Sequence, residues 1–308
     1  MPEKPFLVIA GPTASGKSSL AMKIALDFSG EIINADSMQF YKGLDKGTAK
    51  PGKDELALVP HHLIDIFDIH EASEVFTYVE LAEKAISDIR QRGKLPIIVG
   101  GSGMYIRALL YGLDPLPADP VLRAEFDKEY AGDDSFEKLK ILMEKEDPED
   151  FQRWRKHQRK LIRALEVFRL TGQSITTLQK TWKEKLRYPA IVWYLDWERE
   201  TLKQRIRERT IEMLSNGWLE ETGKLLSEGI LNTPTARQAI GYGIISEYLA
   251  GRIDYETMKE KIITSTWHLA KRQITWFTRK HPEAEKIPMP TNYPELCKKL
   301  KFKLFSMG

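Results

Sequence analysis

The chain has 308 residues, of which 42% are hydrophobic and 30% charged, and its formal net charge is +3 at neutral pH. These values predict a soluble protein of one large or two modest domains, and no apolar run reaches the roughly 18 residues of a membrane span. The single cysteine, Cys297, excludes a disulfide framework, and we expect a cytoplasmic protein without a signal peptide. His61 and His62 have no spaced ligand partner and are interpreted as structural residues rather than metal ligands.

The first strong motif follows the first apolar run. Residues 6–10 read FLVIA and residues 11–18 read GPTASGKS, a complete G-x-x-x-x-G-K-[ST] phosphate loop between a short buried strand and a helix. The loop N–H groups can surround an oxyanion, Lys17 adds a positive charge, and the Ser18 hydroxyl is suited to hold Mg²⁺. The motif predicts binding of a di- or triphosphate by Gly11, Pro12, Thr13, Ala14, Ser15, Gly16, Lys17 and Ser18.

Strands and helices alternate through the first third of the chain. Strands are predicted at 6–10, 31–35 and 95–99, and helices at about 17–28 and 77–91. This alternation predicts an α/β fold with a mostly parallel sheet, in which ligands bind beyond the carboxyl ends of the strands. The phosphate loop, Asp36 and the glycine run at 100–103 should therefore meet at one crevice.

A proline-rich segment at 114–120, DPLPADP, interrupts this pattern. Residues 119–182 are strand-free and helical in pattern, whereas a strand returns at 190–195 and long helices follow, broken at glycines and a proline. We therefore predict a core made of residues 1–118 and 183–308, with an inserted helical domain at 119–182. The insertion and a second basic cluster at 271–280 carry interleaved aromatic residues, which leaves phosphate-backbone binding and a solvated helix face as alternatives.

Asp36 is the strand-end acidic residue nearest to the phosphate loop. The strand at 95–99 ends in glycines instead of the aspartate that holds Mg²⁺ in ATPases, which argues against a motor or switch function. Asp36 is suited to act as a general base, which its spacing favours, or to cap a turn before Ser37.

Two further features also have two interpretations each. Arg205 and Arg209 lie four residues apart on a predicted helix, so they share a face that could clamp a departing diphosphate. The alternative is pairing along the helix with Glu208 or Glu212. The donor-rich segment at 41–51 could meet phosphate or nucleotide, but by itself it is interpreted as a surface loop.

Together these pieces resemble the tRNA dimethylallyltransferase (tRNA isopentenyltransferase) family over about residues 7–278. The matching blocks are GPTASGKS, DSMQFYKGLDKGTAKP, VPHHLID, PIIVGGSGMY, RKLIRALEVF, AIGY and AKRQITWF. The resemblance implies a phosphate-loop NTPase-like sheet with an inserted all-helical tRNA-binding domain. It also implies transfer of a dimethylallyl group from dimethylallyl diphosphate to N6 of the adenosine after the anticodon, position 37, in tRNAs reading codons that begin with U.

The resemblance further implies roles for individual residues. Asp36 would take the N6 proton beside Ser102, where the family usually has threonine. Thr13, Lys17 and Mg²⁺ on Ser18 would stabilise charge on the diphosphate, which the face of Arg205 and Arg209 could also bind. The anticodon stem-loop of tRNA would be the partner of a monomeric enzyme, through Asp36, Ser37, Met38, Gln39, Ser102, Arg123, Arg159, Lys160, Arg163, Lys271, Arg272 and Gln273.

Two blocks depart from the family pattern. Residues 155–158 read RKHQ where Pro-Asn-Asp is common, and Trp267 follows Thr266 where arginine is usual. Two other functions stay open from the sequence. A nucleoside or nucleotide kinase would use the same loop for ATP and Asp36 for an acceptor hydroxyl, although the basic insertion argues against a small acceptor. A non-enzymatic RNA-binding module is the other alternative, against which the intact loop argues.

Overall fold

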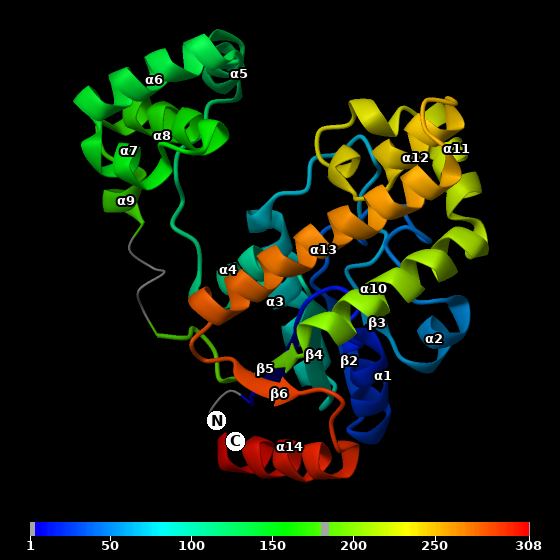
Figure 1. Ribbon diagram of the computed structural model, residues 1–308. Coiled ribbons are helices and arrows are strands. Elements are labelled where there is room, and N and C mark those ends of the chain that lie inside the picture. The colour runs from blue at the N-terminus through cyan, green and yellow to red at the C-terminus, as the bar shows by residue number, and fades with distance from the viewer. Residues whose placement is uncertain (1–3, 180–184, 308) are drawn as a thin grey trace. The chain divides into compact units, whose positions relative to one another are not determined.

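A six-stranded sheet forms the centre of the larger of two compact units (Figure 1). The computed structural model describes residues 4–179 and 185–307; the larger unit comprises 1–110 with 186–308, and the smaller one 111–185. Neighbouring strands are all parallel, in the order β3-β2-β4-β1-β5-β6. The strands are β1 (Phe6–Ala10), β2 (Gly30–Asn34), β3 (His61–His62), β4 (Leu95–Gly100), β5 (Ala190–Asp196) and β6 (Glu285–Pro288).

The central strands are buried on both faces. Every residue of β1, β2 and β4 is buried, and Leu7 of β1 pairs with Ile97 of β4 and Ile191 of β5. Strands covered on both faces read as continuous apolar runs, which is why the predicted strands match β1, β2, β4 and β5 within one residue. The predicted α/β parallel fold is confirmed. The unpredicted β3 and β6 are short, and only Ile287 of β6 is buried.

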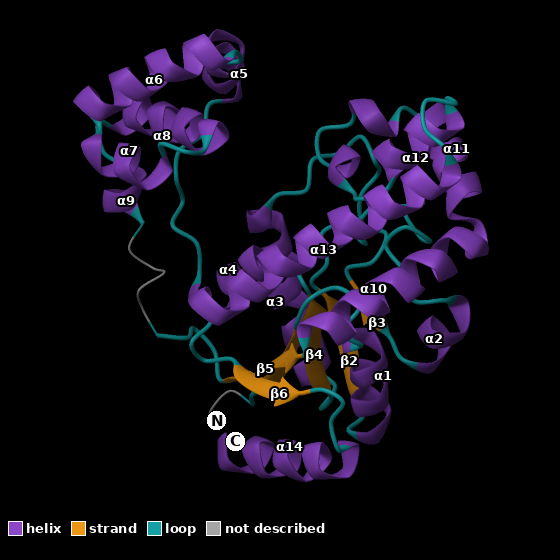
Figure 2. Cartoon of the chain, viewed as in Figure 1, coloured by secondary structure: helices purple, strands orange, loops and turns teal. Residues whose placement is uncertain are grey.

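Helices cover both faces of this sheet (Figure 2). The predicted helices at 17–28 and 77–91 are confirmed as α1 and α3. The helices of the larger unit are α1 (Lys17–Asp27), α2 (Lys53–Leu58), α3 (Val75–Gln91), α4 (Gly103–Tyr111), α10 (Arg199–Met213), α11 (Leu219–Ser227), α12 (Tyr242–Leu249), α13 (Tyr255–Lys280) and α14 (Tyr293–Met307), with short turns η2 (Leu214–Trp218), η3 (Ile230–Asn232) and η4 (Ala236–Gln238).

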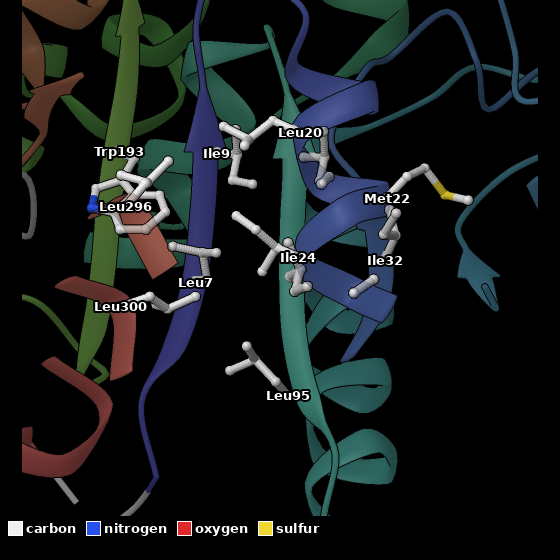
Figure 3. Close-up of a cluster of buried hydrophobic side chains, with 14 of the residues drawn as sticks. Leu7, Ile9, Leu20, Met22, Ile24, Ile32, Leu95, Trp193, Leu296 and Leu300 are labelled. Carbon is white, nitrogen blue, oxygen red and sulfur yellow. The ribbon is translucent and has the colours of Figure 1, made fainter. Parts of the chain in front are cut away.

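One hydrophobic cluster joins the sheet to helices from both ends of the chain. Leu20 and Ile24 of α1 pack on Leu7 and Ile9 of β1, while Leu296 from α14 lies by the strands as well (Figure 3). Burying one such leucine or isoleucine contributes about 1.5–3 kcal/mol. This packing fixes α1, and with it the loop that precedes α1, relative to the sheet.

The smaller unit contains helices and loops within its described residues, 111–179 and 185. Its helices are α5 (Pro120–Glu129), α6 (Asp133–Glu146), α7 (Pro148–Trp154), α8 (Gln158–Thr171) and α9 (Ile175–Leu178). Asp119 caps α5 by accepting hydrogen bonds from the N–H groups of Val121 and Leu122, directly before Pro120. The predicted insertion ran from 119 to 182, and its last residues, 180–182, lie outside the described residues.

Candidate active site

A cavity of about 820 Å³ in the larger unit is bordered by the loop that follows β1 and by the carboxyl ends of β2 and β4. The cavity confirms the prediction that the phosphate loop, Asp36 and the glycine run meet at one crevice, and α10 and α13 also contribute to its lining. Among the predicted site residues, the lining includes Thr13, Ala14, Ser15, Gly16, Lys17, Ser18, Asp36, Ser37, Met38, Gln39, Ser102, Arg205, Arg209, Arg272 and Gln273.

The phosphate loop has the backbone that its glycines and small residues allow. Gly16, the N-cap of α1, has a left-handed φ of 85°, and Ala14 has a φ of 62°. The Lys17 ammonium donates to the carbonyl of Pro12 at 2.7 Å, and the buried Ser15 hydroxyl has no hydrogen-bond partner among the described residues. Burial and then the charge of Arg209 lower the pKa of Lys17 to about 7. The loop therefore presents polar groups whose partners an anion can supply.

Two arginines of α10 face this loop. Arg205 donates through Nε to the Ala14 carbonyl at 2.8 Å, and Arg209 donates to the Thr13 hydroxyl at 3.3 Å. Of the two alternative partners, Glu208 accepts a hydrogen bond from Gln204 instead, whereas the charge of Glu212 acts on Arg209 by raising its pKa against the effect of burial. Burial lowers the pKa of Arg209. With Lys17, these side chains surround the loop with positive charge, as the clamp interpretation requires.

Trp197, which the sequence analysis did not identify, supports the same loop. Its indole N–H donates to the Ser15 carbonyl at 2.9 Å, and the Arg205 guanidinium lies 4.4 Å from its ring centre. The only available signal was its place directly after β5, the strand beside β1. Trp197 and Arg205 thus fix two consecutive carbonyls of the phosphate loop.

Asp36 both closes a turn and faces the cations. Its Oδ1 accepts from the N–H of Met38 at 3.1 Å, and its own N–H donates to the Asn34 side chain at 2.9 Å. Burial lowers the pKa of Lys17 and of Arg209, and the negative charge of Asp36 offsets part of that lowering in both. Asp36 therefore closes the turn, and it also lines the same cavity as the phosphate loop.

The glycine run after β4 brings backbone close to Asp36. A Cβ on Gly100 would lie 2.1 Å from the carbonyl oxygen of Ala35, so only glycine fits there. The Ser102 hydroxyl accepts a hydrogen bond from the N–H of Ser37 at 3.2 Å. These contacts place Ser102 next to the Asp36 turn.

Gln273 of α13 joins the phosphate loop to the glycine run. Its Oε1 accepts from the N–H of Thr13 at 2.8 Å, and its Nε2 donates to the carbonyl of Gly101 at 3.1 Å. Both ends of the amide are thus used within the protein. Gln273 consequently sets the spacing between the loop and the glycine run, whereas its neighbour Arg272 is exposed and lines the cavity.

The interpretation of residues 41–51 as a surface loop is wrong. Tyr41 and Leu44 are fully buried, and residues 47–51 line the cavity. The Lys50 ammonium holds the segment together from inside, donating to the Tyr41 carbonyl and the Asp45 carboxylate, each at 2.7 Å, and to Asp65. The segment is part of the cavity wall because its apolar residues are covered by distant helices.

The adjacent histidines make structural contacts. His62 pairs with the buried Glu31 at 2.7 Å, and the His61 ring contacts the Val59 carbonyl at 2.8 Å. His61 also lines the cavity, and burial lowers its pKa. In the part of the chain that the structure describes, no group of three His, Cys, Asp or Glu residues is arranged to hold a metal ion.

Of the basic residues predicted in the insertion, two have a buried partner. Arg123 and Arg163 contact the fully buried Glu166 at 2.7 and 2.9 Å. Lys160 lies 4.3 Å from the Trp154 ring centre, and Arg159 is exposed. Arg123 and Arg163 therefore contribute to the packing of the smaller unit, while Arg159 and Lys160 carry positive charge at its surface.

The fold and the loop define a phosphate-loop α/β protein. The family model described as IPP transferase matches residues 39–280. A tRNA dimethylallyltransferase from Citrifermentans bemidjiense is 43% identical over 278 residues, which are 89% of each chain. The chain therefore belongs to the IPP transferase family of tRNA dimethylallyltransferases, as its resemblance implied.

Solved structures agree with this membership. The full-length tRNA isopentenylpyrophosphate transferase from Bacillus halodurans aligns with a TM-score of 0.74 and 32% identity, covering 99% of this chain and 98% of that one. A eukaryotic dimethylallyltransferase described as acting on tRNA aligns with a TM-score of 0.80 and 27% identity, covering 99% and 80%. No helix of the described residues is long and apolar enough to cross a membrane.

Proposed function

We propose that this chain transfers a dimethylallyl group from dimethylallyl diphosphate to N6 of the adenosine after the anticodon, position 37, in tRNAs reading codons that begin with U. The single observation that carries the proposal is one cavity with a cation-rich phosphate loop on one side and Asp36 on the other. The relatives named tRNA dimethylallyltransferase support prenyl transfer over the kinase alternative. The products would be N6-(dimethylallyl)adenosine and diphosphate.

The reaction needs charge stabilisation on one side and proton removal on the other. The bond between C1 and oxygen of the donor breaks, and its electron pair leaves on the diphosphate. The loop N–H groups, Thr13, Lys17, Arg205 and Arg209, which meet at the phosphate loop, would stabilise this growing charge. A new bond joins N6 to C1, and Asp36 takes the proton that N6 loses. Ser102 would hold the Asp36 turn beside the adenine.

The oxygen donor beside the phosphate loop fits Mg²⁺. Ser18 lines the cavity, and the residues described, 4–179 and 185–307, include no cluster of three ligand side chains. Mg²⁺ binds diphosphates with few protein ligands and keeps several waters, so this sparse donor set suits it. Ser18 would hold the ion, which when bound would neutralise part of the diphosphate charge.

The tRNA would bind through both units. The adenine must leave its stack to react, so the anticodon loop would present it unstacked to the cavity. The Asp36–Gln39 turn and Ser102 would contact the adenine. The stem-loop would be contacted by basic side chains, namely Lys271, Arg272, Arg123, Arg159, Lys160 and Arg163. A cytoplasmic location and a monomeric enzyme belong to the same proposal.

The test is incubation with labelled dimethylallyl diphosphate, Mg²⁺ and an anticodon stem-loop that carries adenosine at position 37. Label should enter the RNA, and mass analysis should identify dimethylallyladenosine. A stem-loop with guanosine at that position is the matched control and should stay unlabelled. Label released only as free alcohol would defeat the proposal, and phosphoryl transfer from ATP to a nucleoside would establish the kinase instead.

A further inference from the structure

A carboxylate outside the phosphate-loop region holds residues 45–47, which lead into the cavity wall formed by residues 47–51. Glu221, in the first turn of α11, accepts hydrogen bonds through Oε2 from the N–H groups of Asp45 at 3.0 Å and Lys46 at 2.7 Å. Its Oε1 accepts from the Gly47 N–H at 3.1 Å and from the Tyr242 hydroxyl at 2.7 Å. A carboxylate has about four acceptor positions, so these donors satisfy Glu221 completely. Three consecutive N–H groups around one anion form a nest that fixes the loop backbone.

The loop is pressed tightly against the helical layer at this point. A Cβ on Gly47 would lie 2.3 Å from the Trp218 indole nitrogen and 2.5 Å from the Tyr242 hydroxyl. Trp218 and Tyr242 are buried and meet edge to face, with ring centres 6.0 Å apart. The Glu221 carboxylate and the two rings therefore hold residues 45–47 against the helical layer. Lys50 ties the same loop to the Tyr41 carbonyl and the Asp45 carboxylate.

From this loop, hydrogen bonds continue to the Asp36 turn. The Gln39 side chain donates to the carbonyls of Thr48 at 3.0 Å and Ala49 at 3.3 Å. The Gln39 N–H donates to the Asp36 carbonyl at 3.2 Å. The position of the loop is thus linked to the position of the Asp36 carboxylate. The phosphate loop, by contrast, is held by Trp197, Arg205 and Gln273, none of which contacts Glu221 through a hydrogen bond among the described residues.

We propose that Glu221 is a positioning residue for the acceptor side of the cavity. It holds residues 45–47, and through Thr48, Ala49 and Gln39 it orients Asp36 without affecting the diphosphate side. The kinetic part of this inference rests on the proposed prenyl transfer. A glutamine could not replace Glu221, because its NH₂ group would face N–H donors that need an acceptor.

The kinetic test compares Glu221→Gln with Glu220→Gln. Glu220 is exposed on the same helix turn, so its substitution removes the same charge from the helix N-terminus. For Glu221→Gln we expect kcat with the stem-loop to fall about 10- to 100-fold, as for a misplaced reacting group. Affinity for inorganic pyrophosphate should not change, and Glu220→Gln should behave as the wild type. The assays are run at a temperature at which circular dichroism shows all the proteins fully folded.

Amide hydrogen exchange tests, without using activity, whether Glu221 holds the backbone of residues 45–47. We call this set of hydrogen bonds the Glu221 clamp. Glu221→Gln should expose the amides of Asp45, Lys46 and Gly47 to faster exchange, whereas Tyr242→Phe, which removes one of the four donors, should leave them protected. Unchanged exchange in Glu221→Gln would overturn the clamp. Faster exchange with an unchanged kcat, or an equal loss of pyrophosphate affinity, would overturn the positioning role. A wild-type enzyme that does not prenylate RNA would instead refute the proposed function, while the exchange result would still report on the clamp.

Discussion

The two sides of the cavity are built in different ways. The phosphate side is one continuous segment, residues 11–18, whose charge is increased by Arg205 and Arg209. The acceptor side combines residues 36–39, 45–51 and 100–102, which are joined by side chains from other elements. Binding a charged leaving group depends on local composition, whereas orienting a base depends on contacts between segments far apart in the chain. The predictions below test this division.

The largest effect on turnover is expected at Asp36, where the role in the turn and the role as a general base can be tested separately. Asp36→Asn keeps an oxygen that can accept from the Met38 N–H, so the turn should survive. It removes the proton acceptor, and we expect turnover to fall by roughly 10²–10⁴. RNA affinity, measured by filter binding, should stay nearly unchanged. Asp36→Ala removes both properties, whereas turnover close to the wild type in Asp36→Asn would show that the residue serves only the turn.

Lys17→Met should reduce turnover by about 10²–10³ through the diphosphate side alone, because it removes one charged donor to the leaving group. Affinity for inorganic pyrophosphate should fall with turnover, and RNA affinity should not. Lys23→Met, an exposed position on the same helix, is the control and should match the wild type. If Lys17→Met weakened RNA binding as strongly as pyrophosphate binding, the two sides of the cavity would not be independent.

The sequence predicts the parts of the molecule whose cause is local. The strands of the sheet centre are buried on both faces, so the apolar run at 6–10 is sufficient to locate β1. The phosphate loop is a contiguous motif, and the spacing of Arg205 and Arg209 places both on one helix face. Each of these features depends on neighbours within a few residues.

The remaining features depend on partners that local patterns do not reveal. Segment 41–51 reads as polar and exposed, yet its Tyr41 and Leu44 are buried, and Trp218, Glu221 and Tyr242 contact it from about 170 to 200 positions away. The two-residue strand β3 has no periodicity to detect, since a strand signal needs several alternating residues. On the acceptor side, strand-end position predicted Asp36 and the glycine run, and the family resemblance added roles for residues 37–39 and Ser102. The contacts that support these residues required the structure.

Gln273 lies between the two sides, and its substitution should have an intermediate effect. Gln273→Leu keeps the size of the side chain but leaves the Thr13 N–H and the Gly101 carbonyl without their present partner. We expect kcat to fall about 10-fold, less than a misplacement of about 1 Å can cost. Thr275→Val, at an exposed position on the same helix, is the control. A result that changed only RNA affinity would mean that Gln273 serves tRNA contact and not the spacing of the two sides.

The pH dependence of diphosphate binding should report on Lys17. Burial holds its pKa at about 7 in the free protein, so near pH 8 most of the side chain is neutral. A bound anion favours the ammonium, and binding should therefore take up close to one proton there, with affinity weakening as pH rises above 7. Calorimetry with pyrophosphate in buffers of different ionisation enthalpy measures the uptake. Lys17→Met should lack this contribution, and an equal uptake in both proteins would contradict the assignment.

The smallest effect on catalysis is expected at the opposite end of β2. Glu31 is buried and contacts Lys94 at 2.9 Å, His62 at 2.7 Å and also Arg92. These partners outweigh burial, which by itself would raise the pKa, and lower it to about 2 from its usual 4.5. Because the folded pKa is depressed, the stabilisation is complete above the unfolded value and is lost as pH falls from about 4.5 toward 2.

Glu31→Gln should therefore leave kcat unchanged and lower the free energy of unfolding by about 2 kcal/mol near neutral pH, the contribution of hydrogen bonds to a charged group. Urea denaturation of both proteins measures the difference, which should narrow at about pH 3. A difference that stays constant between neutral pH and about pH 3 would attribute the loss to packing instead of charge. A fall in kcat would show that this end of the sheet is coupled to the cavity. Changes in fold stability could then not be separated from changes in site geometry, and the comparison of the two sides requires that separation.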